Sequence, residues 1–97
     1  MSVYIILGKY THEGITAIKD STQRLEAARG TMKSLGGELK DFYYTMGRYD
    51  FISICEAPSN EAAMQFMIEI GSRGAVSTET LIALPAGEGA ELIKKLS

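Results

Sequence analysis

Between residues 3 and 35 the hydrophobic pattern of the chain changes once, from that of a strand to that of a helix. Residues 3–10, "VYIILGKY", are β-branched and aromatic without helical spacing, which predicts a strand. Both parities of this strand are apolar, so we expect it to be covered on two faces. From about Thr16 to Leu35, apolar residues recur at three- and four-residue steps, which predicts one long helix ending at Gly36-Gly37. The apolar stripe of this helix consists of Ile18, Leu25, Ala28, Met32 and Leu35.

A hairpin is predicted in the middle of the chain. Residues 38–46 and 49–57 read as strands on either side of a Gly-Arg pair. Gly47 suits the first central position of a type II′ turn, because that position needs positive φ. A two-residue turn pairs Tyr44 with Phe51, whereas a three-residue turn would flip the partners of one strand.

The last third predicts a helix, a strand and a tail helix. Ser59 is a natural N-cap for a helix that ends near the next glycines. Residues 75–84 read as a strand that a proline stops, and 89–97 as a short tail helix. The predicted buried faces are Ala63, Phe66, Met67 and Ile70 on the first helix, and Leu92, Ile93 and Leu96 on the tail.

The order β-α-β-β-α-β predicts an α+β, ferredoxin-like fold over a single domain, 1–97: an antiparallel four-stranded sheet with two helices on one face plus a C-terminal helix. Two helices leave the second sheet face in water with aromatic and aliphatic side chains on it. The tail stripe is too narrow to cover that face. We therefore expect a homodimer, sheet against sheet, with further assembly through strand edges left open.

Composition removes several classes of function. The net charge is −2 and no basic face or arm occurs, so nucleic-acid binding is not expected. A lone cysteine, Cys55, excludes an internal disulfide, suits a reducing cytosol and is expected to be a buried thiol. No stretch approaches the roughly 20 apolar residues that span a membrane, and the start lacks a charged leader. The sequence predicts a cytoplasmic protein without membrane contact.

The run 47–84 resembles the GYD-domain family. The resemblance rests on the motifs that this run contains, with "YTHEG" (10–14) and "GGELKDFYYTMG" (36–47) similar to the first half of the family. Those motifs are Gly47, Tyr49 and Asp50, then Glu56-Ala57-Pro58, Gly71 with Gly74, and Thr78-Glu79-Thr80. The resemblance implies a ferredoxin-like unit of the dimeric α/β-barrel kind, whose relatives include small monooxygenases, haem-degrading enzymes and muconolactone-isomerase-like proteins. Kinship of fold does not assign a function.

Candidate chemistry is thin. His12, the only histidine, follows the first strand and is the candidate catalytic residue, because imidazole titrates near neutral pH. A solvent-exposed, inert histidine is the competing interpretation. Tyr43 and Tyr49 could orient a phenolic ligand or simply fill a sheet and an interface. Asp50 could accept hydrogen bonds from turn amides. No metal is predicted, since His12 has no second ligand at suitable spacing, and no cofactor is expected.

Two functions compete. The first is a homo-oligomeric module for assembly or for binding a small apolar or aromatic ligand, with the site between helices and sheet near His12, Tyr43, Tyr49 and Asp50. The alternative is a small cofactor-poor oxygenase or isomerase-like enzyme that uses His12 with a tyrosine. The sequence leaves open whether the protein is an enzyme, and which charge pairs with Glu79.

Overall fold

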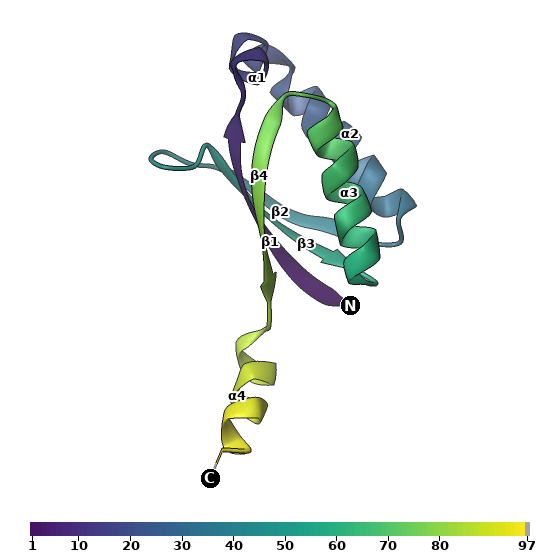
Figure 1. The fold of residues 1–97 in the computed structure, drawn as a ribbon, viewed down its shortest axis with the longest axis vertical. Helices are drawn as coiled ribbons and strands as arrows, with labels where there is room; N and C mark the ends of the chain where they lie inside the picture. Colours follow the sequence, from purple (N-terminus) through teal and green to yellow (C-terminus); the bar gives the residue numbers. More distant parts are fainter. Residues whose placement is uncertain (97) are drawn as a thin grey trace.

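Within residues 1–96, which the computed structural model describes, the chain forms a four-stranded antiparallel sheet with helices packed on one face (Figure 1). The strand order is β2-β3-β1-β4, which confirms the ferredoxin-like α+β fold. The last position of the predicted tail helix, 97, lies outside the described residues. The elements are β1 (Ser2–Tyr10), α1 (His12–Thr16), the 3-10 turn η1 (Ile18–Asp20), α2 (Ser21–Ser34), β2 (Glu38–Tyr44), β3 (Phe51–Ala57), α3 (Asn60–Ser72), β4 (Val76–Ala83) and α4 (Ala86–Lys94).

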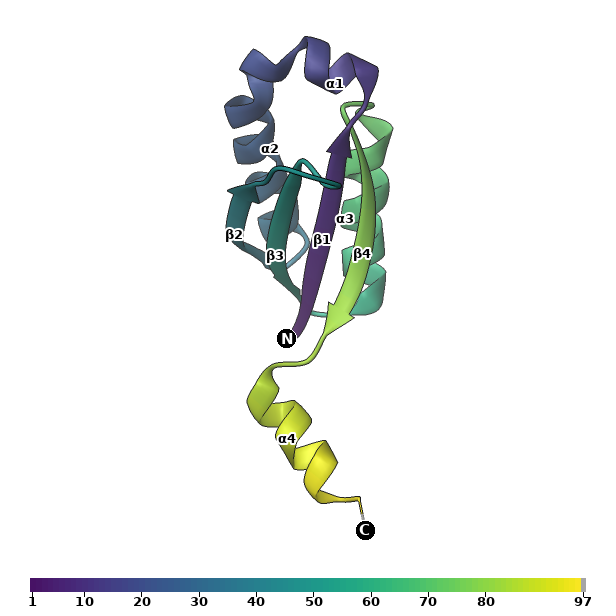
Figure 2. The same cartoon turned by 90° about the vertical axis from the view of Figure 1, so that its left-hand side faces the viewer.

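The prediction of one long helix from Thr16 to Leu35 is wrong. The chain instead forms α1, η1 and α2, which turn through a corner (Figure 2). Thr11 fixes this corner: its hydroxyl donates to the Gly74 carbonyl at 2.6 Å and accepts from the Gly14 amide at 3.1 Å. Its own amide donates to the carbonyl of Ala75. Contacts with the turn before β4 thus hold α1 apart from α2.

The two-residue hairpin is also wrong. β2 ends at Tyr44 and β3 begins at Phe51, so residues 45–50 form a longer loop that projects from the sheet (Figure 1). The predicted pairing of Tyr44 with Phe51 is confirmed. The loop is longer because Asp50 is bonded to β1: its amide donates to the Gly8 carbonyl at 2.8 Å. The positive φ predicted for Gly47 is confirmed, at 109°.

The hydrophobic core lies between the sheet and the two main helices. Tyr4, Ile6 and Cys55 point into it from the sheet. The predicted face of α3 is confirmed, with Ala63 and Phe66 buried and its other two members packed against them. Most of the predicted α2 stripe also packs here, with Met32 fully buried. Ile18, in η1, is the exception and is exposed.

The opposite side of the sheet carries no helix (Figure 2). Directly paired residues of antiparallel strands point to the same side, and Ile5 pairs with both Ile54 of β3 and Leu81 of β4. Strand β1 is therefore covered by helices on one face only. We call the uncovered surface the open face; its apolar members are Val3, Ile5, Leu7, Tyr43, Ile52, Ile54, Leu81 and Ala83.

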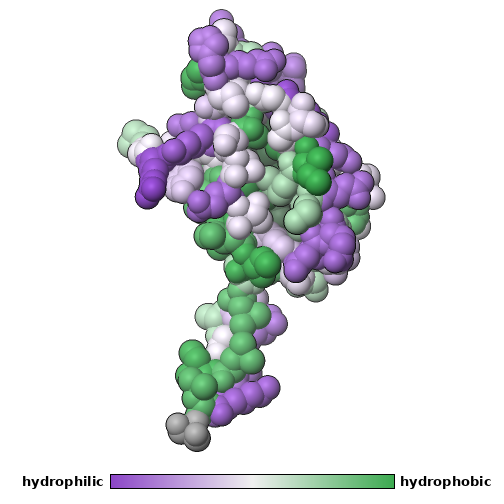
Figure 3. All heavy atoms as spheres, in the orientation of Figure 1, coloured by the Kyte–Doolittle hydropathy of each residue, from purple (hydrophilic) through white to green (hydrophobic). Residues whose placement is uncertain are grey.

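Helix α4 does not cover the open face. It stands away from the body of the molecule and has no buried residue (Figure 1). The predicted stripe of the tail, Leu92 and Ile93 in α4 and Leu96 just beyond its end, is exposed. Figure 3 shows apolar side chains gathered from the end of β4 along α4. The tail therefore adds a second uncovered apolar surface.

Strand β2 is an edge strand with an irregularity. Leu39 pairs with Cys55 and Asp41 with Ile54, so Lys40 is an extra residue without a partner in the ladder. Its ammonium group lies between two carboxylates, 3.7 Å from Glu38 and 3.6 Å from Glu56. The bulge therefore places charge along this edge.

Candidate functional site

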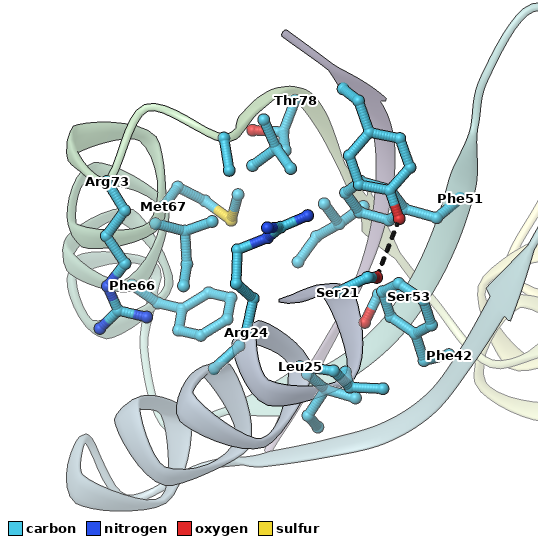
Figure 4. Close-up of a pocket in the computed structure, with 17 residues that line it drawn as sticks. Ser21, Arg24, Leu25, Phe42, Phe51, Ser53, Phe66, Met67, Arg73 and Thr78 are labelled. Atoms are coloured by element: carbon cyan, nitrogen blue, oxygen red, sulfur yellow. Dashed lines mark hydrogen bonds between the residues drawn. The ribbon is translucent and has the colours of Figure 1, made fainter. Parts of the chain in front are cut away.

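A cleft of about 80 Å³ opens between the sheet and helices α2 and α3 (Figure 4). Aromatic and aliphatic side chains make most of its wall, and Ser21, Ser53 and Thr78 contribute hydroxyl groups. The apolar wall includes Ile6, Tyr10, Leu25, Ala28, Leu39, Phe42, Phe51, Phe66, Met67, Ile70, Ala75 and Val76. A mostly apolar cavity with a few directed polar groups is typical of small-molecule sites.

Two arginines complete the lining, and no acidic residue belongs to it. Arg24 extends from α2 so that its guanidinium lies inside the cavity, whereas Arg73 of α3 bends away from it (Figure 4). Arg24 donates to the Ala17 carbonyl at 2.9 Å and, more weakly, to the Gly14 carbonyl at 3.4 Å. Arg73 donates to the Thr31 hydroxyl. The cleft therefore has a positive charge within a largely apolar wall.

A chain of hydroxyl groups closes one side of the cleft. The hydroxyl of the buried Ser21 lies 3.3 Å from the Tyr10 hydroxyl and 2.8 Å from that of Tyr44. This arrangement joins α2 to β1 and β2. Each hydroxyl can donate or accept, so the chain can adjust to a polar group that enters the cleft.

Stacked aromatic rings form the wall next to these hydroxyls. The rings of Phe42 and Phe51 stack with centroids 5.1 Å apart, and Tyr10 lies tilted against Phe51 at 5.6 Å. Tyr44 meets the edge of Phe42. Stacked and edge-to-face aromatic pairs are worth about 0.5–1.5 kcal/mol beyond the area that they bury. The ring contacts therefore stabilise this wall.

The structure does not bring the predicted site residues together at this cleft. His12 is exposed at the start of α1, and Tyr43 is exposed on the open face. Tyr49 lies in the loop under the Lys9 ammonium, which is 5.6 Å from the ring centroid. The Asp50 carboxylate accepts a hydrogen bond from the Tyr10 amide at 2.9 Å. Asp50 thus ties the loop to β1 rather than capping amides of its own turn.

Cys55 is a buried thiol in the core, 3.5 Å from the Ser53 hydroxyl. Burial raises the pKa of Cys55, and the nearby Ser53 hydroxyl and Arg29 charge lower it less. A thiol in this state is a poor nucleophile. Among residues 1–96, no His, Cys, Asp and Glu side chains gather in a group able to hold a metal ion.

Sequence reasoning missed the residues that form the cleft. Ser21, Arg24, Leu25 and Ala28 follow the spacing of one helix face, and two of them are polar. The polar residues Ser21 and Arg24 within this apolar stripe were the signal from which the cleft could have been predicted. An arginine at such a position must reach a buried acceptor or a cavity.

The fold and cleft define a class: ferredoxin-like α+β domains with a cavity between helices and sheet. A profile of the GYD domain family matches residues 4–93. The chain belongs to the GYD domain family, as the sequence resemblance predicted. No helix among residues 1–96 is long and apolar enough to cross a membrane.

Comparison with individual proteins agrees with this assignment. A protein of Thermus thermophilus, named "Glutamine synthetase and cystathionine beta-lyase binding protein", is 29% identical over 97 residues, covering 99% of each chain. The crystal structure of MtbAldR is similar with a TM-score of 0.68 and 18% identity over 86% of this chain, which corresponds to only 51% of that one. The crystal structure of TTHA0845, also from Thermus thermophilus, gives a TM-score of 0.55 and 21% identity over 87% of this chain and 94% of its own. At these identities the structural likeness concerns the fold alone.

Proposed function

We propose that the protein is a homodimeric binding module that assembles through its open face and holds another protein. The observation that carries this proposal is the uncovered apolar centre of the sheet. Its members come from all four strands, so the surface is continuous across the sheet. A surface of this kind marks an interaction site in most proteins that keep it.

The energetics favour a second copy as the cover. Removing apolar surface from water is worth about 25 cal/mol per Å². An interface of ordinary size buries about 800 Å² on each partner. The free energy gained by burying this area exceeds the cost of association when packing is good. A two-fold axis lets the same patch serve both chains, so one surface is enough.

The rim of the open face supports the same arrangement. At the end near the 45–50 loop, the lining of a hollow includes the charged residues Lys9, Arg48 and Glu79. At the opposite end lie Glu56 and the bulged Lys40. An apolar centre with a charged rim is the usual anatomy of a protein interface. In the dimer, Glu79 would find its basic partner across the axis.

The protein partner is proposed from the relative. A protein aligned over 99% of both chains is named for binding glutamine synthetase and cystathionine beta-lyase. We extend that role to this chain, with a metabolic enzyme as the partner. The exposed stripe of Leu92, Ile93 and Leu96 offers such a partner an apolar surface that is separate from the open face.

A binding role fits the site better than the enzymatic alternative. An oxygenase or isomerase that uses His12 with a tyrosine needs both groups at one cavity. His12 is exposed and does not belong to the residues that line the cleft. We therefore build the proposal on binding.

Sedimentation velocity tests the dimer. The natural chain is expected to sediment as a dimer at micromolar concentration, and Ile54→Glu as a monomer, because the new carboxylate would lie in the apolar centre of the interface. Thr22→Glu, on the exposed side of α2, is the matched control and should remain dimeric. Circular dichroism checks that each variant is folded. A natural chain that sediments as a monomer overturns the assembly.

Calorimetric titration tests the partner. We expect saturable binding of the dimer to glutamine synthetase or to cystathionine beta-lyase from the source organism. A double substitution of the exposed apolar stripe, Leu92→Glu in α4 with Leu96→Glu just beyond its end, is expected to weaken binding while leaving the dimer intact. Absence of heat and of co-sedimentation with both enzymes would refute the partner that we propose.

A further inference from the structure

The cleft between helices and sheet lies on the side of the sheet opposite to the open face, so the proposed assembly leaves it without a role. We propose that this cleft binds a short-chain monocarboxylate. The carboxylate is held by the Arg24 guanidinium, and the aliphatic tail lies against Phe42, Phe51 and Met67. This ligand site is independent of the proposed protein partner.

Arg24 belongs to none of the ion pairs formed within residues 1–96. Its hydrogen bonds go to the carbonyl oxygens of Ala17 and Gly14, which orient the guanidinium and leave N–H donors unused. Figure 4 shows the group inside the cavity, with Met67 to its left, Thr78 above it and Phe51 to its right. A positive charge in such a wall is stabilised by an anion.

A guanidinium presents paired N–H groups that match a carboxylate with two parallel hydrogen bonds. A phosphate carries more charge and needs several donors, but Arg73 bends away to bond Thr31 and leaves Arg24 as the only cation inside the cavity among the residues that line it. The hydroxyls of Ser21 and Tyr10 can donate to a carboxylate oxygen on the same side. One carboxylate therefore fits the polar groups.

The lining contains no Asp or Glu, so an ammonium group would have no ion-pair partner, which disfavours amino acids. The remaining wall is aromatic and aliphatic. A cavity of about 80 Å³ is smaller than one of roughly 150 Å³ that holds benzene. The tail is therefore short and uncharged.

The competing explanation is that Arg24 only clamps the corner between α1 and α2. Arg29 provides the contrast, because it also bonds a backbone carbonyl, that of Leu39 at 3.1 Å, but it pairs with Glu26 and does not line the cleft. An arginine of this helix with a purely structural role thus pairs with a carboxylate on the protein surface. Arg24 has none and faces a cavity.

The test uses butyrate as the probe, followed by the amide shifts of the isotopically labelled full chain. Butyrate is expected to shift the amides around Ser21, Phe51 and Ser53 in a saturable manner at millimolar concentration. 1-Butanol and butylammonium, of similar size, are expected to bind at least about tenfold more weakly, because each lacks the charge-assisted hydrogen bonds.

Variants separate the binding role from the clamp. Arg24→Gln should weaken butyrate binding by about tenfold or more, and Arg24→Lys by less, because lysine keeps the charge but loses the fork. Arg29→Gln, the matched control, should leave butyrate affinity unchanged. If Arg24→Gln fails to fold, the lysine variant and the comparison with 1-butanol still test whether Arg24 binds the carboxylate.

Three results would overturn the proposal: no saturable shift with butyrate, equal binding of butanol, or butyrate affinity unaffected by substitution of Arg24. The Ile54→Glu chain should retain butyrate binding whether or not the natural chain is a dimer. Failure of the assembly and failure of the ligand site are therefore observed separately.

Discussion

Gly8 of β1 lies directly beneath the ring of Phe51, its partner on β3, and a side chain at position 8 would occupy the space of that ring. Both residues are buried. We expect Gly8→Ala to lower the free energy of unfolding by about 1–3 kcal/mol through overpacking, measured by urea denaturation. In a Phe51→Leu background the same change should cost less, because the ring has been removed.

Gly30 is the control for this substitution. It lies within α2 with no atom near the position of an added Cβ. Gly30→Ala should stabilise the protein by about 0.5–1 kcal/mol, since alanine loses less conformational freedom in a helix. Equal effects at positions 8 and 30 would show that packing beneath Phe51 is unimportant.

The loop before β3 depends on backbone conformation rather than on space. Gly47 has a φ of 109° and an added Cβ would meet nothing within 4 Å. Gly47→Val is expected to destabilise the protein by about 1–3 kcal/mol, because a β-branched residue is strained at positive φ. Gly71→Ala, in α3 with equally open surroundings, should be neutral or stabilising. A thermal midpoint unchanged by Gly47→Val would mean that the loop relaxes freely.

Asp50 anchors the same loop to β1. Its carboxylate accepts from the Tyr10 amide, and its own amide donates to the Gly8 carbonyl. Asp50→Ala should cost about 1–3 kcal/mol, because the Tyr10 amide loses a charged acceptor. Hydrogen exchange should show faster exchange at Tyr10 in this variant, with the amides of α3 unaffected. Unchanged protection of Tyr10 would contradict the assigned role.

The buried thiol predicts a dependence of stability on alkaline pH. Burial raises the pKa of Cys55 in the folded chain, so the native state holds this proton more tightly than the unfolded state. The stabilisation that this difference gives the folded chain is complete below the pKa of the unfolded thiol, about 8.5. It is lost as the pH rises through the pKa of the folded thiol. The unfolding free energy of the natural chain should therefore fall more steeply above about pH 8.5 than that of Cys55→Ala. Parallel pH profiles would contradict this.

The order of elements was predictable because each one carries its own periodicity. The strands and α3 are defined by local patterns, and Ser59 caps α3 as predicted, accepting from the Ala62 amide at 3.1 Å. The positive φ of Gly47 could likewise be predicted from the residue type and its place between two strands. Nothing in these patterns required knowledge of distant residues.

The corner at α1 was not predictable for the opposite reason. Thr11 is held by the carbonyls of Gly74 and Ala75, which are remote in the sequence, and the Ala75 carbonyl leaves no room for a side chain at Gly14. The stretch between Thr16 and the start of α2 contains no proline or glycine that would signal a break. Tertiary hydrogen bonds overrode the local helical preference.

The candidate site could not be predicted from the sequence for a related reason. His12 and the tyrosines attracted attention by residue type, whereas the cleft is formed by where α2 and α3 meet the sheet. Arg24 has ordinary neighbours in the sequence and becomes notable only when its guanidinium is seen inside an apolar wall (Figure 4). Residue type suggests chemistry, but a cavity is a property of packing.

The bulge at Lys40 has a consequence for how many copies can join. A regular outer strand could extend its hydrogen-bond ladder into a neighbouring molecule and grow into a fibre. Here β2 is interrupted at its edge, and the interruption carries an ammonium group flanked by Glu38 and Glu56. A second sheet that approaches this edge would meet an interrupted hydrogen-bond ladder. It would also have to remove charged groups from water, which costs free energy. We therefore expect no fibre growth along this side, and the expectation of further assembly through strand edges does not extend to β2.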